Sequence, residues 1–201
     1  MFTGIIETTA RIDSKENIGN NVRIAIVLDK KWKLKLGDSV AVAGVCLTVA
    51  EIKKMKKSAK NNTSDDLYFF DIIPESLSKT TFGKNIYPVV NIERPLVFGA
   101  RVHGHIISGH VNCTGIVSKI TDDKKGYRIK IAYPKKFKKY VIEKGSIVID
   151  GTSLTIAGVK NSAKTSSFAV ALVPHTLKIT TLSNLQKGDI VNLEFDLSTK
   201  K

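Results

Sequence analysis

The chain has 201 residues, 42% of them hydrophobic, and a formal net charge of +14 from 32 Lys and Arg against 18 Asp and Glu. No stretch approaches the ~20 apolar residues of a membrane span, and no basic flank precedes an apolar core at the N-terminus, so we expect no membrane segment and no secretory signal. Its two cysteines, Cys46 and Cys113, lack a disulfide or metal spacing, which favours a cytoplasmic protein.

In chain order, the first half predicts a series of short strands. Apolar and polar residues alternate over 22–26, as in a strand with one buried face, and strand-like runs cover 2–12, 39–42, 45–52, 68–73 and 87–93. Residues 53–66 are polar and lysine-rich, which predicts a long exposed loop. Pro74 ends one strand, and residues 75–79 can form a helical turn.

The second half repeats this series. Gly44-Val45-Cys46-Leu47-Thr48-Val49 returns as Gly151-Thr152-Ser153-Leu154-Thr155-Ile156, and the runs around Gly4, Arg23, Pro74 and Asn91 also recur in order. Such ordered matches indicate a tandem duplication of a small domain. We therefore expect an all-β protein of two domains, residues 1–97 and 98–201, each a barrel of about six strands that leaves no open edge.

The repeated glycines, Gly44 and Gly151, lie between strand runs, where the backbone must turn sharply or approach another group closely. A tight turn alone explains them. Each is also followed by a small polar side chain, Cys46 or Ser153, and then by a Thr, Thr48 or Thr155, which can hydrogen-bond a flat heterocycle at a barrel mouth.

Three histidines lie close together in the sequence, and their spacing does not match a zinc site, so we expect no metal. His110 stands where the first copy has Ile5, so the fold does not need an imidazole there and a functional role is favoured. Likewise Cys46 becomes Ser153. The two copies are alike in pattern and differ in chemistry.

The high positive charge raises the hypothesis of a nucleic-acid-binding protein. The lysines are scattered over predicted loops without an aromatic ladder or a recognised motif, so we expect a solvated surface and no nucleic-acid partner. A polyanion site is the alternative.

Several motifs together resemble riboflavin synthase: Met1 to Glu7, Gly44 to Val49, Gly104-His105 with Ser108 to Val111, and Asp150 to Thr155. The resemblance extends to Asp196. It implies two six-stranded Greek-key lumazine-binding barrels. The implied reaction moves a four-carbon unit between two molecules of 6,7-dimethyl-8-ribityllumazine, giving riboflavin and 5-amino-6-ribitylaminouracil, without cofactor or metal. The alternative is a non-catalytic lumazine or flavin carrier, similar to the antenna proteins of luminous bacteria.

The resemblance also implies site residues. Those in or near catalysis are Phe2, Ser39, Cys46, His110 and Asp196. One substrate pocket would comprise Gly4, Ile5, Ile6, Lys144, Ser153, Leu154, Thr155, Ala171, Leu172, Val173, Pro174, His175 and Thr176. The other would comprise Cys46, Leu47, Thr48, Asp71, Ile72, Ile73, Pro74, Glu75, Ser76, Gly109, His110 and Val111. In this picture the first strand of each copy borders the pocket of the other.

The implied chemistry needs a base for an acidic lumazine methyl group and a nucleophile for the acceptor ring. His110 is a candidate base, and Cys46, Ser39 or an activated water is a candidate nucleophile. The family forms homotrimers that its C-terminal helix ties together. Only five residues follow Asp196 here, so we expect self-association, as a trimer weaker than in helix-bearing relatives.

Overall fold

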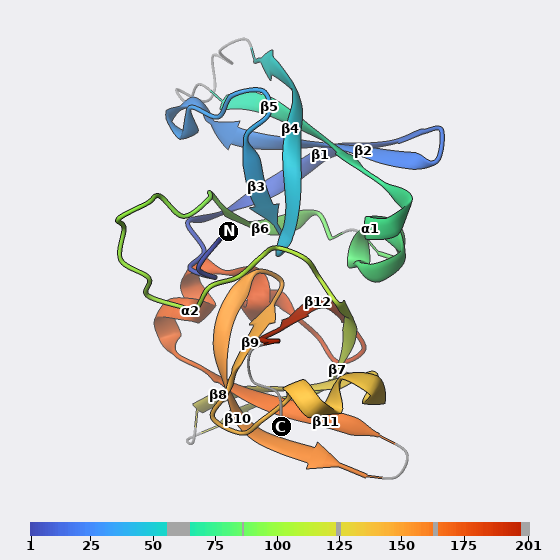
Figure 1. The fold of residues 1–201 in the computed structure, drawn as a ribbon, viewed down its shortest axis with the longest axis vertical. Coiled ribbons are helices and arrows are strands. Elements are labelled where there is room, and N and C mark those ends of the chain that lie inside the picture. Colours follow the sequence, from blue (N-terminus) through green and yellow to red (C-terminus); the bar gives the residue numbers. More distant parts are fainter. Residues whose placement is uncertain (56–64, 86, 124–125, 163–164, 198–201) are drawn as a thin grey trace.

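The computed structural model describes residues 1–55, 65–85, 87–123, 126–162 and 165–197. They form two closed antiparallel barrels of six strands each, stacked along the long axis of the molecule (Figure 1). The predicted all-β fold and the duplication are confirmed. The predicted loop over 53–66 falls mostly outside the described residues. In the part of the chain that is described, no helix is long and apolar enough to span a membrane.

The first barrel has the strand order β1-β2-β5-β4-β3-β6, in which the hairpin-connected strands β3, β4 and β5 return to β2, as in a Greek key. Its strands are β1 (Thr8–Ile18), β2 (Asn21–Asp29), β3 (Ser39–Val42), β4 (Val45–Lys54), β5 (Asp65–Ile72) and β6 (Val89–Glu93). Short helices follow β2 and β5: η1 (Lys30–Trp32), α1 (Pro74–Lys79) and η2 (Thr81–Gly83).

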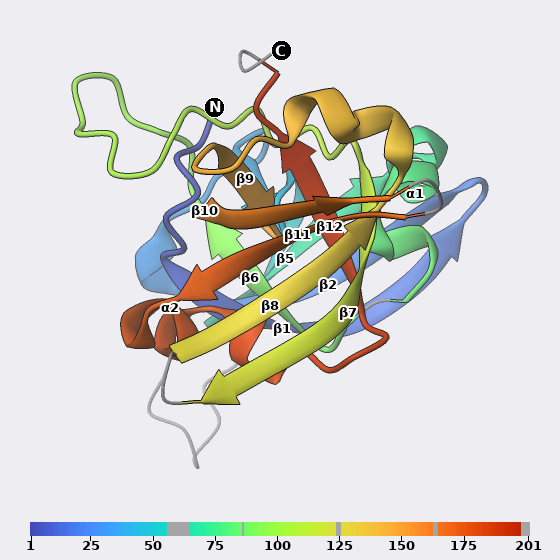
Figure 2. The ribbon, with the colours of Figure 1, turned by 90° about the horizontal axis from the view of Figure 1, so that it is seen from below.

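The second barrel repeats this plan, with the order β10-β11-β8-β7-β12-β9. Figure 2 views the molecule from below, with the second barrel toward the viewer. Its strands are β7 (Cys113–Asp123), β8 (Gly126–Tyr133), β9 (Ser146–Ile149), β10 (Thr152–Asn161), β11 (Ser166–Leu172) and β12 (Ile190–Phe195). Its helices are η3 (Lys135–Tyr140), α2 (Pro174–Ile179) and η4 (Thr181–Asn184).

Each barrel has its own apolar core, because alternate residues of every strand point inward. In β2 the buried side chains include Val22, Ile24 and Ile26, and Trp32 of η1 closes the same core. Ile129 and Ile131 of β8 hold the matching places in the second core. The domain boundary at 97/98 stays a prediction.

The first strand was expected over residues 2–12, but β1 begins only at Thr8. The preceding residues leave their own barrel, because Gly4 adopts a left-handed conformation with φ of 76° that no regular strand accepts. The same departure occurs in the second copy at Gly109, with φ of 80°. These two segments, 1–7 and 105–111, are called the crossing segments below.

The barrels meet at two turns that touch each other. A Cβ atom built on Gly44 would lie 2.6 Å from the amide nitrogen of Gly151, so the turns can pack only as glycines. Of the two alternatives that the sequence left open, both occur here: each glycine has a positive φ in a turn and closely approaches the other.

Two asparagines connect the barrels reciprocally. Asn91 Nδ2 donates to the Asp150 carbonyl (2.9 Å), and its Oδ1 accepts from Thr181 N (2.8 Å). Asn192 does the same in the other direction, to the Ala43 carbonyl (2.9 Å) and from Thr81 N (2.8 Å). Both asparagines are about 1% exposed, so water cannot replace these bonds.

Replacing Asn192 by Ala should therefore weaken the junction. The change leaves a buried carbonyl and a buried amide without partners, which we expect to lower the free energy of unfolding by about 2–4 kcal/mol. Asn17→Ala, on an exposed hairpin, is the matched control and should change stability by less than about 0.5 kcal/mol. Urea denaturation measures both; equal effects would show that the junction bond contributes little.

Candidate active site

The two crossing segments pair with each other through main-chain hydrogen bonds. Phe2 N donates to Ile107 O (2.8 Å), and Ile107 N donates to Phe2 O (3.0 Å). Phe2 and Ile107 are buried together with Ala41 of β3 and Val148 of β9, and Cys46 packs against them. Phe2 is therefore a core residue of the junction, and its buried side chain belongs to the apolar cluster on which Cys46 packs.

Each crossing segment then docks on the opposite barrel. Ser153 N of β10 donates to Gly4 O (2.9 Å), and Cys46 N of β4 donates to Gly109 O (2.8 Å). A Cβ on Gly4 would lie 2.5 Å from the Ser153 Cβ, and one on Gly109 would lie 2.7 Å from the Cys46 Cβ. Only glycine fits at these crossings, and each segment lies against the opposite barrel, as the family resemblance implied.

Two buried glutamates hold the crossing segments in place. The Glu93 carboxylate accepts from Thr3 N and Thr3 Oγ1 (both 2.7 Å) and from Gly4 N (3.0 Å). Glu194 accepts from Ser108 N, Ser108 Oγ and Gly109 N at 2.8, 2.7 and 3.0 Å. Burial raises the pKa of Glu93, against the lowering effect of its hydrogen bonds.

The first pocket lies at the mouth of the first barrel, between β4, α1 and the second crossing segment, and has a volume of ≈ 420 Å³. Cys46, Glu75, Ser76, Gly109 and His110 line it. His110 is exposed and Cys46 is half-buried. The structure thus brings these two predicted residues together.

The other residues predicted for this pocket lie around it with different exposures. Ser39 of β3 is directly opposite Thr48 of β4 in the register, and Thr48 is exposed. The side chains of Leu47, Ile72 and Val111 are buried in the first core, which leaves only their main chain to border a ligand.

Asp71 already has a strong partner, because Arg23 donates to both of its carboxylate oxygens at 2.7 and 2.8 Å. These hydrogen bonds hold the pKa of Asp71 below its usual range. Ile73 and Pro74 are exposed where β5 leads into α1.

The second predicted pocket centres on Ser153 and Thr155 of β10. Leu154, between them, is half-buried against the second core. Ile5 is exposed on its crossing segment and Ile6 is buried. At the junction of β11 and α2, Leu172 is buried and Thr176 is half-buried, whereas the remaining predicted residues are exposed: Ala171, Val173, Pro174 and His175.

Lys144 lies in the turn before β9, where its amide donates to Ile156 O (2.8 Å). Its φ is 67°, a left-handed conformation that Gly37 adopts at the matching turn of the first barrel. A side chain in that conformation costs about 1 kcal/mol. Ser146, two residues later, pairs with Thr155 in the register, so the turn lies beside the second pocket.

His105 is a site residue that the sequence reasoning did not select. Its Nδ1 lies 2.7 Å from Ser153 Oγ, a hydrogen bond between the second crossing segment and a strand of its own barrel. Burial lowers the pKa of His105, and the carboxylates of Asp196 and Glu194 oppose that shift. The signal available in the sequence was that His105 lies close to His110, in the segment 105–111. The corresponding segment of the first copy, 1–7, was itself expected to border the strand that carries Ser153.

A groove of ≈ 450 Å³ joins the two histidines of the crossing segment. His105, Ser108, His110, Glu194 and Asp196 are among its lining residues. Asp196, predicted from the sequence, is half-buried at its edge. A base, a hydroxyl and a carboxylate are thus available along one surface.

Within the described ranges no group of three or more His, Cys, Asp or Glu side chains is arranged to hold a metal ion. The nitrogen, oxygen and sulfur atoms of the site are spread along pockets, which suits hydrogen bonds to a heterocycle.

Comparison with known proteins places this geometry in a family. The Lumazine binding domain profile matches residues 3–95 and 108–196. A riboflavin synthase of Actinobacillus pleuropneumoniae is 39% identical over 205 residues, covering 100% of this chain and 87% of the relative. One from Chlamydia pneumoniae is 38% identical, covering 100% and 92%.

Among solved structures, LumP complexed with riboflavin shares the fold, with a TM-score of 0.78 and 24% identity over 98% of this chain and 100% of that chain. The full-length relatives and the doubled domain match agree with each other and with the two barrels. The chain belongs to the riboflavin synthase family and carries its two lumazine-binding domains.

Proposed function

We propose that this protein is a transferase that converts two molecules of 6,7-dimethyl-8-ribityllumazine into riboflavin and 5-amino-6-ribitylaminouracil. The observation that carries the proposal is the pair of matching crossings, which share one main-chain frame and differ in their side chains. Cys46 and Gly109 face each other in one, and Ser153 and Gly4 in the other. Two bound copies of one substrate can then take different roles, and binding replaces their chance encounter by an oriented pair.

The residues of the first pocket supply the more reactive groups. His110 presents an imidazole at the pocket surface that can take the proton of the lumazine methyl group. Cys46, beside it, offers a thiol that can add to the acceptor ring. Ser39 or an activated water is the alternative nucleophile.

The second pocket supplies hydrogen bonds. The hydroxyl groups of Ser153 and Thr155 can bond to the polar edge of a pterin-like ring. Lys144 keeps a strained conformation where the other barrel uses glycine, and retained strain supports a functional side chain. We propose that its ammonium group binds a polar group of the substrate.

A non-catalytic carrier is the competing function, because LumP structures hold lumazine, riboflavin or flavin mononucleotide in a similar fold. Binding alone needs neither a thiol nor an imidazole at the first pocket. The presence of both Cys46 and His110 there favours the enzyme.

The first prediction separates these functions. With 6,7-dimethyl-8-ribityllumazine as sole substrate, riboflavin should appear in the absorbance spectrum, and His110→Ala or Cys46→Ser should slow its formation about 100-fold by removing a proton carrier or a nucleophile. Lumazine binding should stay within about threefold. His103→Ala removes an exposed imidazole outside the pockets and should leave the rate unchanged.

Lumazine that binds and stays unchanged would identify a carrier instead. A His110→Ala protein with full turnover would remove His110 from the mechanism while leaving the enzyme assignment intact.

The second prediction concerns His105, which we propose positions the Ser153 hydroxyl through their 2.7 Å hydrogen bond. His105→Ala and Ser153→Ala should each lower kcat/KM about 10- to 100-fold. The double variant should lose no more activity than the more strongly impaired single variant. The acid limb of the pH profile should also change in His105→Ala. Additive losses and an unchanged pH profile would show that the two side chains act separately.

We further propose that the working enzyme is a cytoplasmic homotrimer in which a second copy covers the groove between His105 and His110. Free thiols at Cys46 and Cys113 support a reducing compartment. Large apolar side chains surround the crossing segments without cover in one chain: Met1, Val97, Phe98 and Ile106. Such exposed apolar side chains favour a protein interface, and the segment between the barrels that carries three of them loops out beside the junction (Figure 1).

The third prediction is that turnover per subunit falls on dilution together with the mass measured by light scattering. Phe98→Ser should require about tenfold more protein for half-maximal activity, because it removes a fully exposed aromatic ring from the interface. Ile18→Ser, at the tip of the β1–β2 hairpin, is the control and should leave the dilution curve in place. Constant specific activity in a protein that stays monomeric would refute a shared site.

A further inference from the structure

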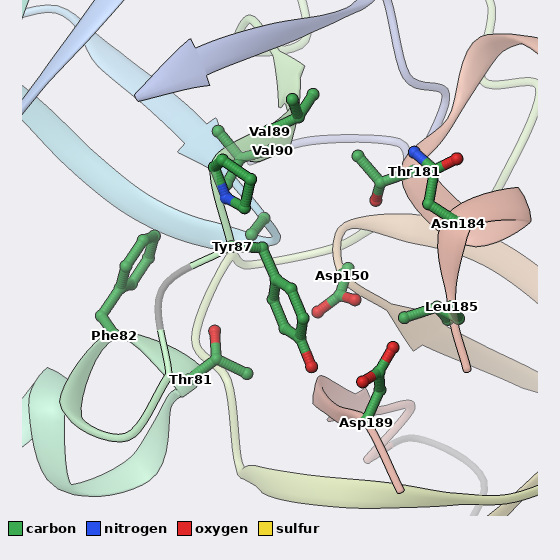
Figure 3. Close-up of a pocket in the computed structure, with 12 residues that line it drawn as sticks. Thr81, Phe82, Tyr87, Val89, Val90, Asp150, Thr181, Asn184, Leu185 and Asp189 are labelled. Atoms are coloured by element: carbon green, nitrogen blue, oxygen red, sulfur yellow. The ribbon is translucent and has the colours of Figure 1, made fainter. Parts of the chain in front are cut away.

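A cavity of ≈ 130 Å³ lies between the two barrels and shares no lining residue with the pocket and groove described above (Figure 3). Phe82, Tyr87 and Val90 contribute from the first barrel, and Asp150, Leu185 and Asp189 from the second. Figure 3 shows the Tyr87 ring reaching across toward the two carboxylates. Ile190 N donates to the Tyr87 hydroxyl (3.0 Å) and fixes the ring in this place.

Asp150 is the unusual member of this lining. It is only 7% exposed, and one carboxylate oxygen accepts from Asn192 N (2.7 Å). Its other oxygen has no hydrogen bond, and no Lys, Arg or His pairs with the side chain, among the residues that the structure describes. Burial raises the pKa of Asp150 to about 7, and the like charge of Asp189 adds to the shift. An ionised carboxylate here lacks a counter-charge.

The duplication shows that the turn does not need this carboxylate. Ala43 holds the matching position with φ of 47°, against 45° for Asp150. Both residues donate their amide to the matching asparagine carbonyl, Ala43 to Asn91 (2.8 Å) and Asp150 to Asn192 (3.0 Å). The carboxylate is therefore an addition to a turn that folds without one, and it lines the cavity.

The surroundings decide what kind of cation would fit. A bound metal ion favours several charged oxygen ligands, and the lining offers two carboxylates beside neutral polar and apolar side chains. A cationic nitrogen on a small apolar body matches better, because the Tyr87 and Phe82 rings can receive the body and attract the charge. At ≈ 130 Å³ the cavity is slightly smaller than an apolar cavity of about 150 Å³ that holds one benzene ring.

We propose that this inter-barrel cavity is a binding site for a small organic monocation, the size of one ring with an amine or amidine group, which pairs with the Asp150 carboxylate. The site is separate from the lumazine pockets. It lies next to the turn that leads through Gly151 to Ser153, so its occupant contacts the structure that positions the second pocket.

Benzamidine is the probe, and benzamide, which has nearly the same shape without the charge, is its control. Calorimetric titration of the full-length protein at pH 8.5 should give benzamidine an affinity at least about tenfold above that of benzamide. Benzamidine stays charged throughout. The other titratable groups that face the cavity are Asp189 and Tyr87, and the raised pKa of Tyr87 keeps its hydroxyl neutral.

Lowering the pH to 6.0 should weaken benzamidine binding about tenfold, because protonation of Asp150 removes its partner. Asp150→Asn keeps the shape and the acceptor for Asn192 N and should cause at least the same loss at pH 8.5. Asp13→Asn removes an equal charge from an exposed hairpin and should have no effect. Amide NMR shifts on titration should centre on Tyr87, Val89 and Val90.

Equal binding of benzamide and benzamidine would overturn the proposal, as would undiminished benzamidine binding by Asp150→Asn. NMR shifts confined to Cys46, His110 and Ser153 would place the probe in the lumazine pockets and would equally overturn it. Benzamidine binding that weakens when Asp150 loses its charge, at pH 6.0 or in Asp150→Asn, supports it.

Discussion

The architecture of the candidate site depends on one exchange, in which each barrel gives its leading segment to the other. Phe2 and Ile107 pair through their main chains, and the chain then passes Gly4 to Ser153 and Gly109 to Cys46 at 2.9 and 2.8 Å. Because these bonds use only main-chain atoms, they impose the same geometry on both barrels whatever the neighbouring side chains are. Glu93 and Glu194 stabilise the exchange, because their carboxylates accept hydrogen bonds from the backbone amides of the two sharp turns.

That division between frame and side chains explains how a duplicated protein can treat two identical ligands differently. The frame requires glycine at the crossings, where any Cβ would meet the opposite strand within 2.7 Å. It leaves the next residue free, and Ile5 and His110 occupy equivalent places. Cys46 against Ser153, and Ala43 against Asp150, are further differences of this kind. Each alters polarity or charge without altering the path of the chain.

The sequence was sufficient for the barrels because periodicity, glycine positions and internal repetition all report on main-chain geometry. The resemblance to a known family also put Cys46 and His110 in one pocket, and both line the same pocket in the structure. The predicted start of the first strand was too early, because the strand-like run from Phe2 includes Gly4, whose left-handed conformation is held by Glu93, distant in the sequence. His105 was missed for a related reason: its contact with Ser153 spans 48 positions and has no local pattern. The burial of Asp150 between barrels likewise follows from their docking alone.

The exchange also makes the integrity of the site a property of both barrels together. Each barrel closes its own sheet and fills its own core, so each has the ingredients of an independent fold. Yet the first pocket is bordered by Gly109, His110 and Val111 of the second copy, and the amide of Ser153 in the second barrel donates to Gly4 of the first copy. A barrel separated from its partner would keep most of its core and lose one wall of its pocket. The buried bonds of Asn91 and Asn192 therefore serve binding as much as stability, because they hold the two barrels at the spacing that the crossing segments require.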